Sequence, residues 1–96
     1  MMFDWDPQKA EANRLKHGIS FEEAATAFAD PEGLDGEDLE HSLTEPRRLR
    51  LAKSALGRVL VIAYTTRRQG DEEITRIISA RRANRKERKR YQAKEN

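Results

Sequence analysis

The sequence contains no cysteine, which excludes disulfide bonds and thiolate metal sites. Its two histidines, His17 and His41, lack the spacing of metal ligands, so we expect no metal ion, and we expect no other cofactor. The longest apolar run, residues 59–64, is far too short to cross a bilayer, and the first residues lack the basic and apolar regions of a signal peptide. We therefore expect a cytoplasmic protein that does not enter a membrane.

Apolar residues are scarce as well. Hydrophobic residues make up 36% of the 96 residues and charged residues make up 38%, so the core of the folded chain has to be thin. A chain of this length is typical of one domain, which we expect to span residues 1–96. Some of its stability is then expected to come from a binding partner.

The net charge of +2 conceals a strong division between the two halves of the chain. Residues 1–46 carry three Lys or Arg against twelve Asp or Glu, a net charge of −9. Residues 47–96 carry sixteen against five, a net charge of +11, and the two values sum to +2. A basic half of this kind indicates a polyanionic partner, although a solvated, charge-laced helix face has the same composition.

Two helices are predicted in the acidic half. Asp6 and Pro7 are typical of an N-cap and a first helical position, and Gly18 ends that helix just after His17. Ser20 opens a second helix, in which a capping box with Glu23 is expected, and an Asp-Pro dipeptide ends it. Residues 3–5 alternate briefly and are compatible with a short strand before the first helix.

The basic half predicts strands followed by a helix. Three β-like runs cover residues 49–52, 59–66 and 74–80 with hairpin-length connections, and one edge strand is expected near residues 39–42. Strong helix formers without glycine or proline extend from residue 81 to about 94. The predicted fold class is α+β: two N-terminal helices packed on a small antiparallel sheet of three to four strands, followed by a basic C-terminal helix.

Strand 74–80 and the final helix hold the densest chemical information. Alternation places Ile74, Arg76, Ile78 and Ala80 on one face of the strand, where an arginine among isoleucines needs an anion nearby. Four-residue spacing places Ala83, Glu87 and Tyr91 on one side of the final helix, within a tract of arginines and lysines. RNA phosphates would compensate this charge, and so would an acidic protein partner.

Motifs spread over nearly the whole chain resemble, in order, the BrnT toxin family. They are Phe-Asp-Trp-Asp-Pro at residues 3–7, Lys-His-Gly-Ile-Ser-Phe at 16–21, Phe-Ala-Asp-Pro at 28–31, Gly-Arg-Val-Leu-Val at 57–61, Tyr-Thr-Thr-Arg at 64–67 and Ile-Ile-Ser-Ala-Arg at 77–81. The resemblance implies a RelE-like fold and a metal-independent endoribonuclease that blocks translation. It also implies a BrnA-like antitoxin that neutralises the toxin and represses the operon, so that operator DNA is reached only through the complex of the two proteins.

Metal-free cleavage of RNA uses the 2′-hydroxyl of the substrate as nucleophile, which leaves the protein to position the strand, move a proton and neutralise the phosphate. The candidates for charge neutralisation are Arg47, Arg67, Arg76 and Arg81, of which Arg76 and Arg81 would meet on one phosphate. The candidates for proton transfer are His17, Glu87 and Tyr91. Contact with the RNA backbone is expected from Arg82, Arg85, Lys86, Arg88 and Lys89, and base stacking from Tyr64 or Tyr91.

Each of these residues also has a structural alternative. An imidazolium at His17 favours the C-terminal end of a helix, and Glu87 is able to pair with arginines on the helix surface. Two other functions are compatible with the same sequence. One is a toxin of the same fold that inhibits a protein target without catalysis, and the other is an accessory protein that binds nucleic acid without cleaving it.

Overall fold

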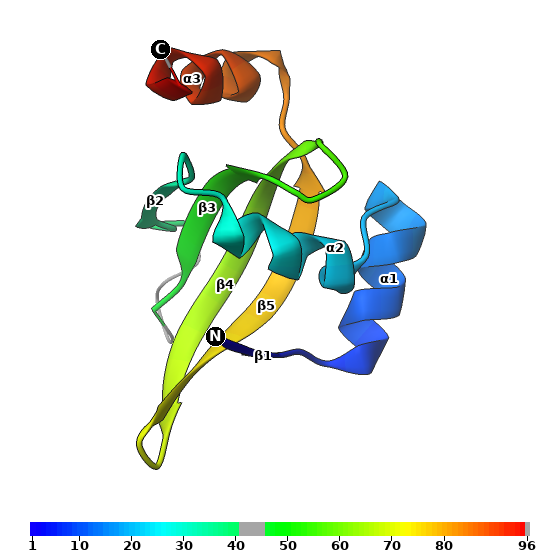
Figure 1. Ribbon diagram of the computed structural model, residues 1–96. Coiled ribbons are helices and arrows are strands. Elements are labelled where there is room, and N and C mark those ends of the chain that lie inside the picture. Colours follow the sequence, from blue (N-terminus) through cyan, green and yellow to red (C-terminus); the bar gives the residue numbers. More distant parts are fainter. Residues whose placement is uncertain (41–45, 96) are drawn as a thin grey trace.

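A computed structural model of the chain describes residues 1–40 and 46–95. In chain order its elements are strand β1 (Met2–Asp4), helix α1 (Pro7–His17), helix α2 (Phe21–Thr26), a 3-10 turn η1 (Ala27–Ala29), strands β2 (Leu34–Glu37), β3 (Arg48–Lys53), β4 (Val59–Gln69) and β5 (Glu72–Arg82), and helix α3 (Arg85–Glu95). Helices α1 and α2 cover one face of the sheet, while α3 lies beyond the end of the sheet where β5 leaves it (Figure 1).

The sheet has five strands in the order β1-β5-β4-β3-β2. β1 pairs with β5 in parallel, and the other neighbours are antiparallel. The prediction of a purely antiparallel sheet of three to four strands was therefore wrong, because the N-terminal segment adds a parallel strand at the β5 edge. The other edge strand lies at Leu34–Glu37 rather than near residues 39–42, of which 41 and 42 lie outside the described residues.

Local capping determines where the first helix begins and ends. The Asp6 carboxylate accepts a hydrogen bond from the Gln8 N–H at 2.8 Å, and Pro7 stands in the first turn. Gly18 ends the helix in the left-handed conformation at φ 71°, where its N–H donates to the Arg14 carbonyl at 2.8 Å. The prediction of this helix from sequence is confirmed at both ends.

The second helix agrees only partly with prediction. Ser20 Oγ accepts from the Glu23 N–H at 3.0 Å, as in a capping box. The Glu23 carboxylate, however, accepts from the Ser54 hydroxyl at 2.7 Å and from the Arg58 guanidinium on the sheet. Glu23 therefore ties α2 to the β3–β4 turn instead of closing its own helix.

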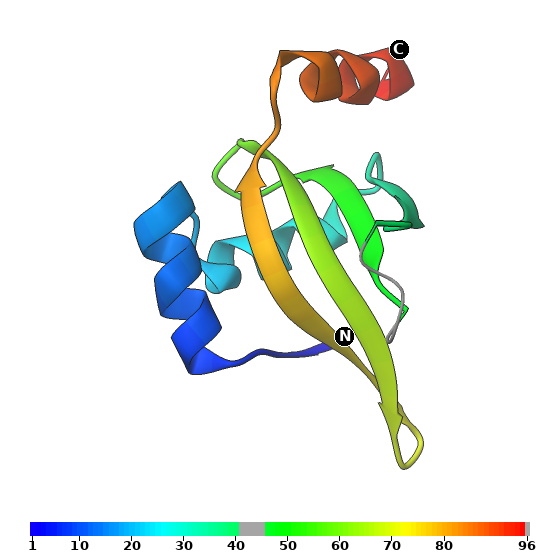
Figure 2. The same ribbon diagram turned by 180° about the vertical axis from the view of Figure 1, so that it is seen from behind.

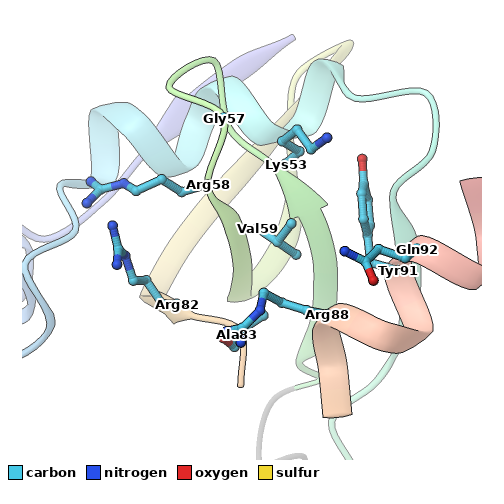
Figure 3. Close-up of a pocket in the computed structure, with 9 residues that line it drawn as sticks. All are labelled: Lys53, Gly57, Arg58, Val59, Arg82, Ala83, Arg88, Tyr91 and Gln92. Atoms are coloured by element: carbon cyan, nitrogen blue, oxygen red, sulfur yellow. Dashed lines mark hydrogen bonds between the residues drawn. The ribbon is translucent and has the colours of Figure 1, made fainter. Parts of the chain in front are cut away.

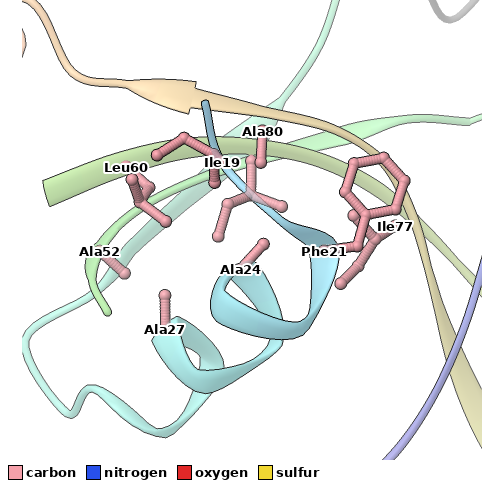
Figure 4. Close-up of a cluster of buried hydrophobic side chains, with 9 residues drawn as sticks. Ile19, Phe21, Ala24, Ala27, Ala52, Leu60, Ile77 and Ala80 are labelled. Carbon is pink, nitrogen blue, oxygen red and sulfur yellow. The ribbon is translucent and has the colours of Figure 1, made fainter. Parts of the chain in front are cut away.

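The core lies between α2 and the covered face of the sheet (Figure 4). Trp5 and Phe28 pack against this core, and the ring centroids of Trp5 and Phe21 lie 5.9 Å apart in an edge-to-face contact. The nine fully or nearly buried members are Ile19, Phe21, Ala24, Ala27, Ala52, Leu60, Ile62, Ile77 and Ala80. Four of these nine are alanines, which agrees with the thin core expected from composition.

An irregularity in β5 changes which side chains face this core. Ala63 pairs with Ser79 while Tyr64 pairs with Ile77, so Ile78 is an extra residue opposite β4. Both Ile77 and Ala80 consequently reach the core, although simple alternation assigned them to opposite faces. That part of the sequence prediction was wrong because a β-bulge shifts the alternation by one residue.

Helix α3 begins at Arg85, four residues later than predicted, because β5 continues through Arg82. Asn84 and Glu87 form a reciprocal cap: the Glu87 N–H donates to Asn84 Oδ1 at 2.8 Å, and the Asn84 N–H donates to Glu87 Oε1 at 2.8 Å. Ala83 lies in the passage before the helix rather than on it, but it still packs with Tyr91 in a second apolar cluster. Viewed from behind, the sheet face away from α2 is open below α3 (Figure 2).

Candidate active site

A cleft of about 450 Å³ lies on the open face of the sheet. Apart from Ala80, the strand residues of its floor do not belong to the core beneath α2, which is why the cleft faces away from that helix; they are Leu49, Val61, Ala63, Ile78 and Ser79. Polar side chains line its rim: Lys16 and His17 at the end of α1, Asp38 and Glu40 after β2, Arg47 before β3 and Arg81 near the end of β5. Of the predicted catalytic residues, this cleft brings together His17, Arg47 and Arg81.

Asn13 connects the two sides of this cleft. Its amide nitrogen donates to the carbonyls of Ile19 at 2.9 Å and Ala80 at 2.8 Å, and its amide oxygen accepts from the Ala80 N–H at 3.1 Å. The side chain is buried, and it joins the end of α1 to the β5 residue that precedes Arg81. Asn13 is absent from the residues predicted to be functional, although it stands three residues after Ala10, the other α1 residue packed toward the core.

Arg81 is held by Glu87 in a two-pronged ion pair, with Nη1–Oε1 at 2.8 Å and Nη2–Oε2 at 2.9 Å. The hydrogen bonds from Arg81 are the largest cause of a lowered pKa of the Glu87 carboxyl and outweigh the opposing effect of burial, and the Asn84 N–H lowers this pKa further. A carboxylate with a lowered pKa is a poor proton acceptor near neutral pH. Glu87 therefore orients Arg81 from the helix rather than standing in the cleft itself.

Arg67 and Arg76 lie elsewhere. Both pair with Asp4 on β1, Arg76 Nη1 at 3.2 Å from Oδ1 and Arg67 Nη2 at 3.3 Å from Oδ2. Asp4 is thus the anion that an arginine within an isoleucine-rich strand was expected to need. Arg76 and Arg81 contact different carboxylates and do not meet around one site, contrary to expectation.

The two tyrosines turn inward. Tyr91 is 2% exposed, and its hydroxyl donates to Asp30 Oδ2 at 2.5 Å. The Tyr64 hydroxyl donates to Asp35 Oδ1 at 2.6 Å, and its ring meets Phe28 edge to face at 5.0 Å. Burial is the largest cause of the raised pKa of the Tyr64 hydroxyl. Neither ring offers an open face for stacking a base, and neither hydroxyl reaches the cleft.

A second cavity of about 460 Å³ lies between the β3–β4 turn, the end of β5 and α3 (Figure 3). Two of the predicted RNA-binding residues, Arg82 and Arg88, line it together with Lys53 and Arg58. The remaining predicted contacts are exposed on α3 and do not line this cavity: Arg85, Lys86 and Lys89. The structure thus divides the basic tract into two groups.

Residues 1–40 and 46–95 contain no group of three or more His, Asp or Glu side chains placed to hold a metal ion. Within the same residues, no helix has the length and apolar composition needed to cross a membrane. His41 lies outside the described residues.

Fold and cleft together define a small α+β protein whose open sheet face presents a histidine and two arginines, the residue types that act on phosphodiesters. The family model described as "Ribonuclease toxin, BrnT, of type II toxin-antitoxin system" matches residues 5–87, and the chain belongs to this family. The resemblance seen in the sequence motifs is thereby confirmed. A type II toxin–antitoxin family implies an antitoxin as partner.

A solved structure shows the same fold. The crystal structure of the Brucella abortus ribonuclease toxin BrnT matches with a TM-score of 0.59 and 18% sequence identity, over 88% of this chain and 100% of that one. No curated protein sequence matches the chain.

Proposed function

We propose that this protein is a metal-independent endoribonuclease that cleaves RNA in the open-face cleft and thereby inhibits translation in the cytoplasm. A BrnA-like antitoxin would neutralise it, and operator DNA would be bound only by the complex of the two. The proposal includes that the fold is RelE-like. The observation that carries it is the convergence of His17, Arg47 and Arg81, from three separate parts of the chain, on one cleft.

In the proposed reaction, His17 accepts the proton of the 2′-hydroxyl as that oxygen attacks the adjacent phosphorus. The bond from phosphorus to the 5′-oxygen breaks, and the departing oxygen takes a proton from water in the open cleft. The products are a 2′,3′-cyclic phosphate and a 5′-hydroxyl. Arg47 and Arg81 neutralise the negative charge that grows on the phosphate oxygens in the transition state.

The other predicted residues take supporting parts in this proposal. Glu87 positions Arg81 through the two-pronged pair, and Tyr91 fastens α3 to the segment after η1 through Asp30. Arg67 and Arg76 stabilise the β1 edge through Asp4. The exposed cations of α3 attract the RNA backbone without regard to its sequence.

The test incubates purified protein with RNA in excess chelator and analyses the ends of the products. We expect cleavage to persist and to yield 2′,3′-cyclic phosphate ends, with activity lost in His17→Ala. Lys9→Ala, an exposed cation of α1 outside the cleft, is the control and keeps full activity. Products with 3′-hydroxyl ends would contradict the mechanism. Growth arrest or RNA binding without any cleavage would favour a non-enzymatic toxin or an accessory nucleic-acid-binding protein.

A further inference from the structure

The cavity at the end of the sheet has an unusual ring of cations. Lys53 ends β3, Arg58 follows the β3–β4 turn, Arg82 ends β5 and Arg88 stands one turn into α3, so four segments each contribute one positive charge. Figure 3 shows Arg58 and Arg82 on one side of the cavity, and Lys53 and Arg88 placed around Val59 at its centre. No sequence motif joins these residues, which only the fold brings together.

Two carboxylates lie next to the ring and balance part of its charge. Glu23 binds Arg58, and Asp30 accepts hydrogen bonds from the Lys53 N–H at 2.8 Å and from the Tyr91 hydroxyl. Four cationic side chains, one from each of four segments, thus line one cavity of about 460 Å³. An anion that enters the cavity would be attracted by all four.

Several of these groups are already held in place. The Glu23 carboxylate orients Arg58 from behind, and Arg88 Nη1 donates to the Ala83 carbonyl at 2.8 Å. Lys53 Nζ stands over the Tyr91 ring at 5.6 Å from its centroid. Because other parts of the protein already position these side chains, an anion that binds here does not have to order all of them first.

Three apolar side chains line the cavity, and two of them are buried: Tyr91 is 2% exposed and Ala83 is 3% exposed. Val59 is partly exposed, so it supplies the exposed apolar side chain of the wall, against four cations. A docked peptide usually depends on buried apolar or aromatic anchors, whereas a phosphate needs only charge and hydrogen-bond donors. These features favour a phosphate over an acidic peptide segment.

The position of the cavity relates it to the proposed active site. Arg81 and Arg82 are neighbours on β5, and alternation directs Arg81 into the open-face cleft and Arg82 into the cavity. An RNA strand that leaves the cleft along the segment between β5 and α3 therefore reaches the cavity. A phosphate close to the one being cleaved then lies in the cavity. The geometry points to a second phosphate-binding site, made of Lys53, Arg58, Arg82 and Arg88, that holds the RNA backbone beside the cleavage site. This inference rests on the proposed function.

The experiment measures the salt dependence of binding to a single-stranded 2′-O-methyl RNA, which lacks the nucleophile and cannot be cleaved. The test variant is Lys53→Ala/Arg82→Ala, and the matched control is Lys9→Ala/Arg68→Ala, which removes one lysine and one arginine, both exposed, outside the two cavities. We expect weaker binding by the test variant and a log–log salt slope smaller by about 0.7 for each phosphate that the protein no longer neutralises. The control should retain the slope of the original protein.

Backbone amide spectra with inorganic phosphate or a nucleoside monophosphate provide a readout that does not depend on RNA cleavage. Signals of Gly57 and Ala83 should shift in the original protein and not in the test variant. If the Gly57 and Ala83 signals shift but the protein binds no RNA, the cavity is a binding site for a free phosphate or nucleotide. The proposed function is then wrong. If no signal shifts and the two double variants bind RNA alike, the inference is overturned. It is equally overturned if the test variant binds RNA normally and fails only to bind the antitoxin.

Discussion

The two ends of the β4–β5 ribbon carry arginines in opposite situations. At the hairpin end, Arg67 and Arg76 both contact Asp4, which the parallel strand β1 supplies. At the exit end, Arg81 contacts Glu87 and lines the cleft, while its neighbour Arg82 lines the second cavity. An arginine of this ribbon therefore stabilises the β1 edge at one end, whereas at the other end an arginine lines a cavity. The difference comes from the neighbouring elements and not from the arginines.

The sharpest test of this comparison is Arg81→Ala. Loss of a donor that stabilises growing negative charge is expected to reduce cleavage by about a hundredfold or more. Antitoxin binding should persist, since the Arg81 side chain is 43% exposed and adds little to the folded state. Arg81→Lys, which keeps the charge but not the two-pronged geometry, should recover only part of the rate. A folded Arg81→Ala protein with full activity would exclude Arg81 from the site.

Asn13 provides the next largest effect, because it supports the exit end from inside the fold. Asn13→Ala removes three hydrogen bonds and leaves the Ala80 N–H without its partner, which should lower the free energy of unfolding by about 2 to 3 kcal/mol. Chemical denaturation measures this change. Asn13→Asp serves as the comparison, since it retains the acceptor for the Ala80 N–H but not the donors. Equal stability of all three proteins would contradict the described connection.

Glu23 permits a test by pH. The hydrogen bonds from Arg58, together with that from Ser54, lower the pKa of the Glu23 carboxyl below 4.5 despite its burial. Its contribution is therefore complete above about pH 4.5 and disappears as the pH falls through the lower folded-state value. Glu23→Gln should cost about 1.5 kcal/mol at pH 7. That difference should narrow as the pH falls below 4.5 in denaturation experiments. A difference in unfolding free energy between Glu23→Gln and the original protein that does not change with pH would contradict the lowered pKa of Glu23.

The smallest effect is expected at the hairpin end. Arg76→Ala breaks one partly exposed ion pair with Asp4 and should lower the free energy of unfolding by about 0.5 to 1 kcal/mol. Cleavage should stay close to that of the original protein, because Arg76 does not line the cleft. The activity assay set beside Arg81→Ala checks this directly. If Arg76→Ala lost as much activity as Arg81→Ala, the two ends would not differ in function.

The fold could be predicted where short-range chemistry controls it. Asp6, Pro7 and Gly18 act within one helical turn, and the structure places α1 where they indicate. Strand β2, with Gly36 in a short and exposed segment, has no comparable local signal and depends on pairing with β3. The bulge at Ile78 is equally invisible in sequence, because it follows from how β5 pairs with β4.

The candidate site could be predicted only as a set of residue types. Sequence reasoning included His17, Arg47 and Arg81, but it also included Arg76 and Tyr91, which have the same chemistry in isolation. Whether each one meets a carboxylate, a core or an open cleft depends on partners distant in the chain. Asp4 and Arg76 are 72 positions apart, and Asp30 and Tyr91 are 61 positions apart.

By itself the sequence determined the family, the α+β class, the N-terminal helix with its caps and the basic character of the second half. These follow from residue order and from interactions within a few residues, which do not need the folded chain. Only the tertiary structure decided which arginines are neutralised, which tyrosines are buried, and that Lys53, Arg58, Arg82 and Arg88 surround one cavity. The physical reason is that burial, ion pairing and electrostatic repulsion depend on distance in space, and residues far apart in the chain become neighbours only when the strands pair into the sheet.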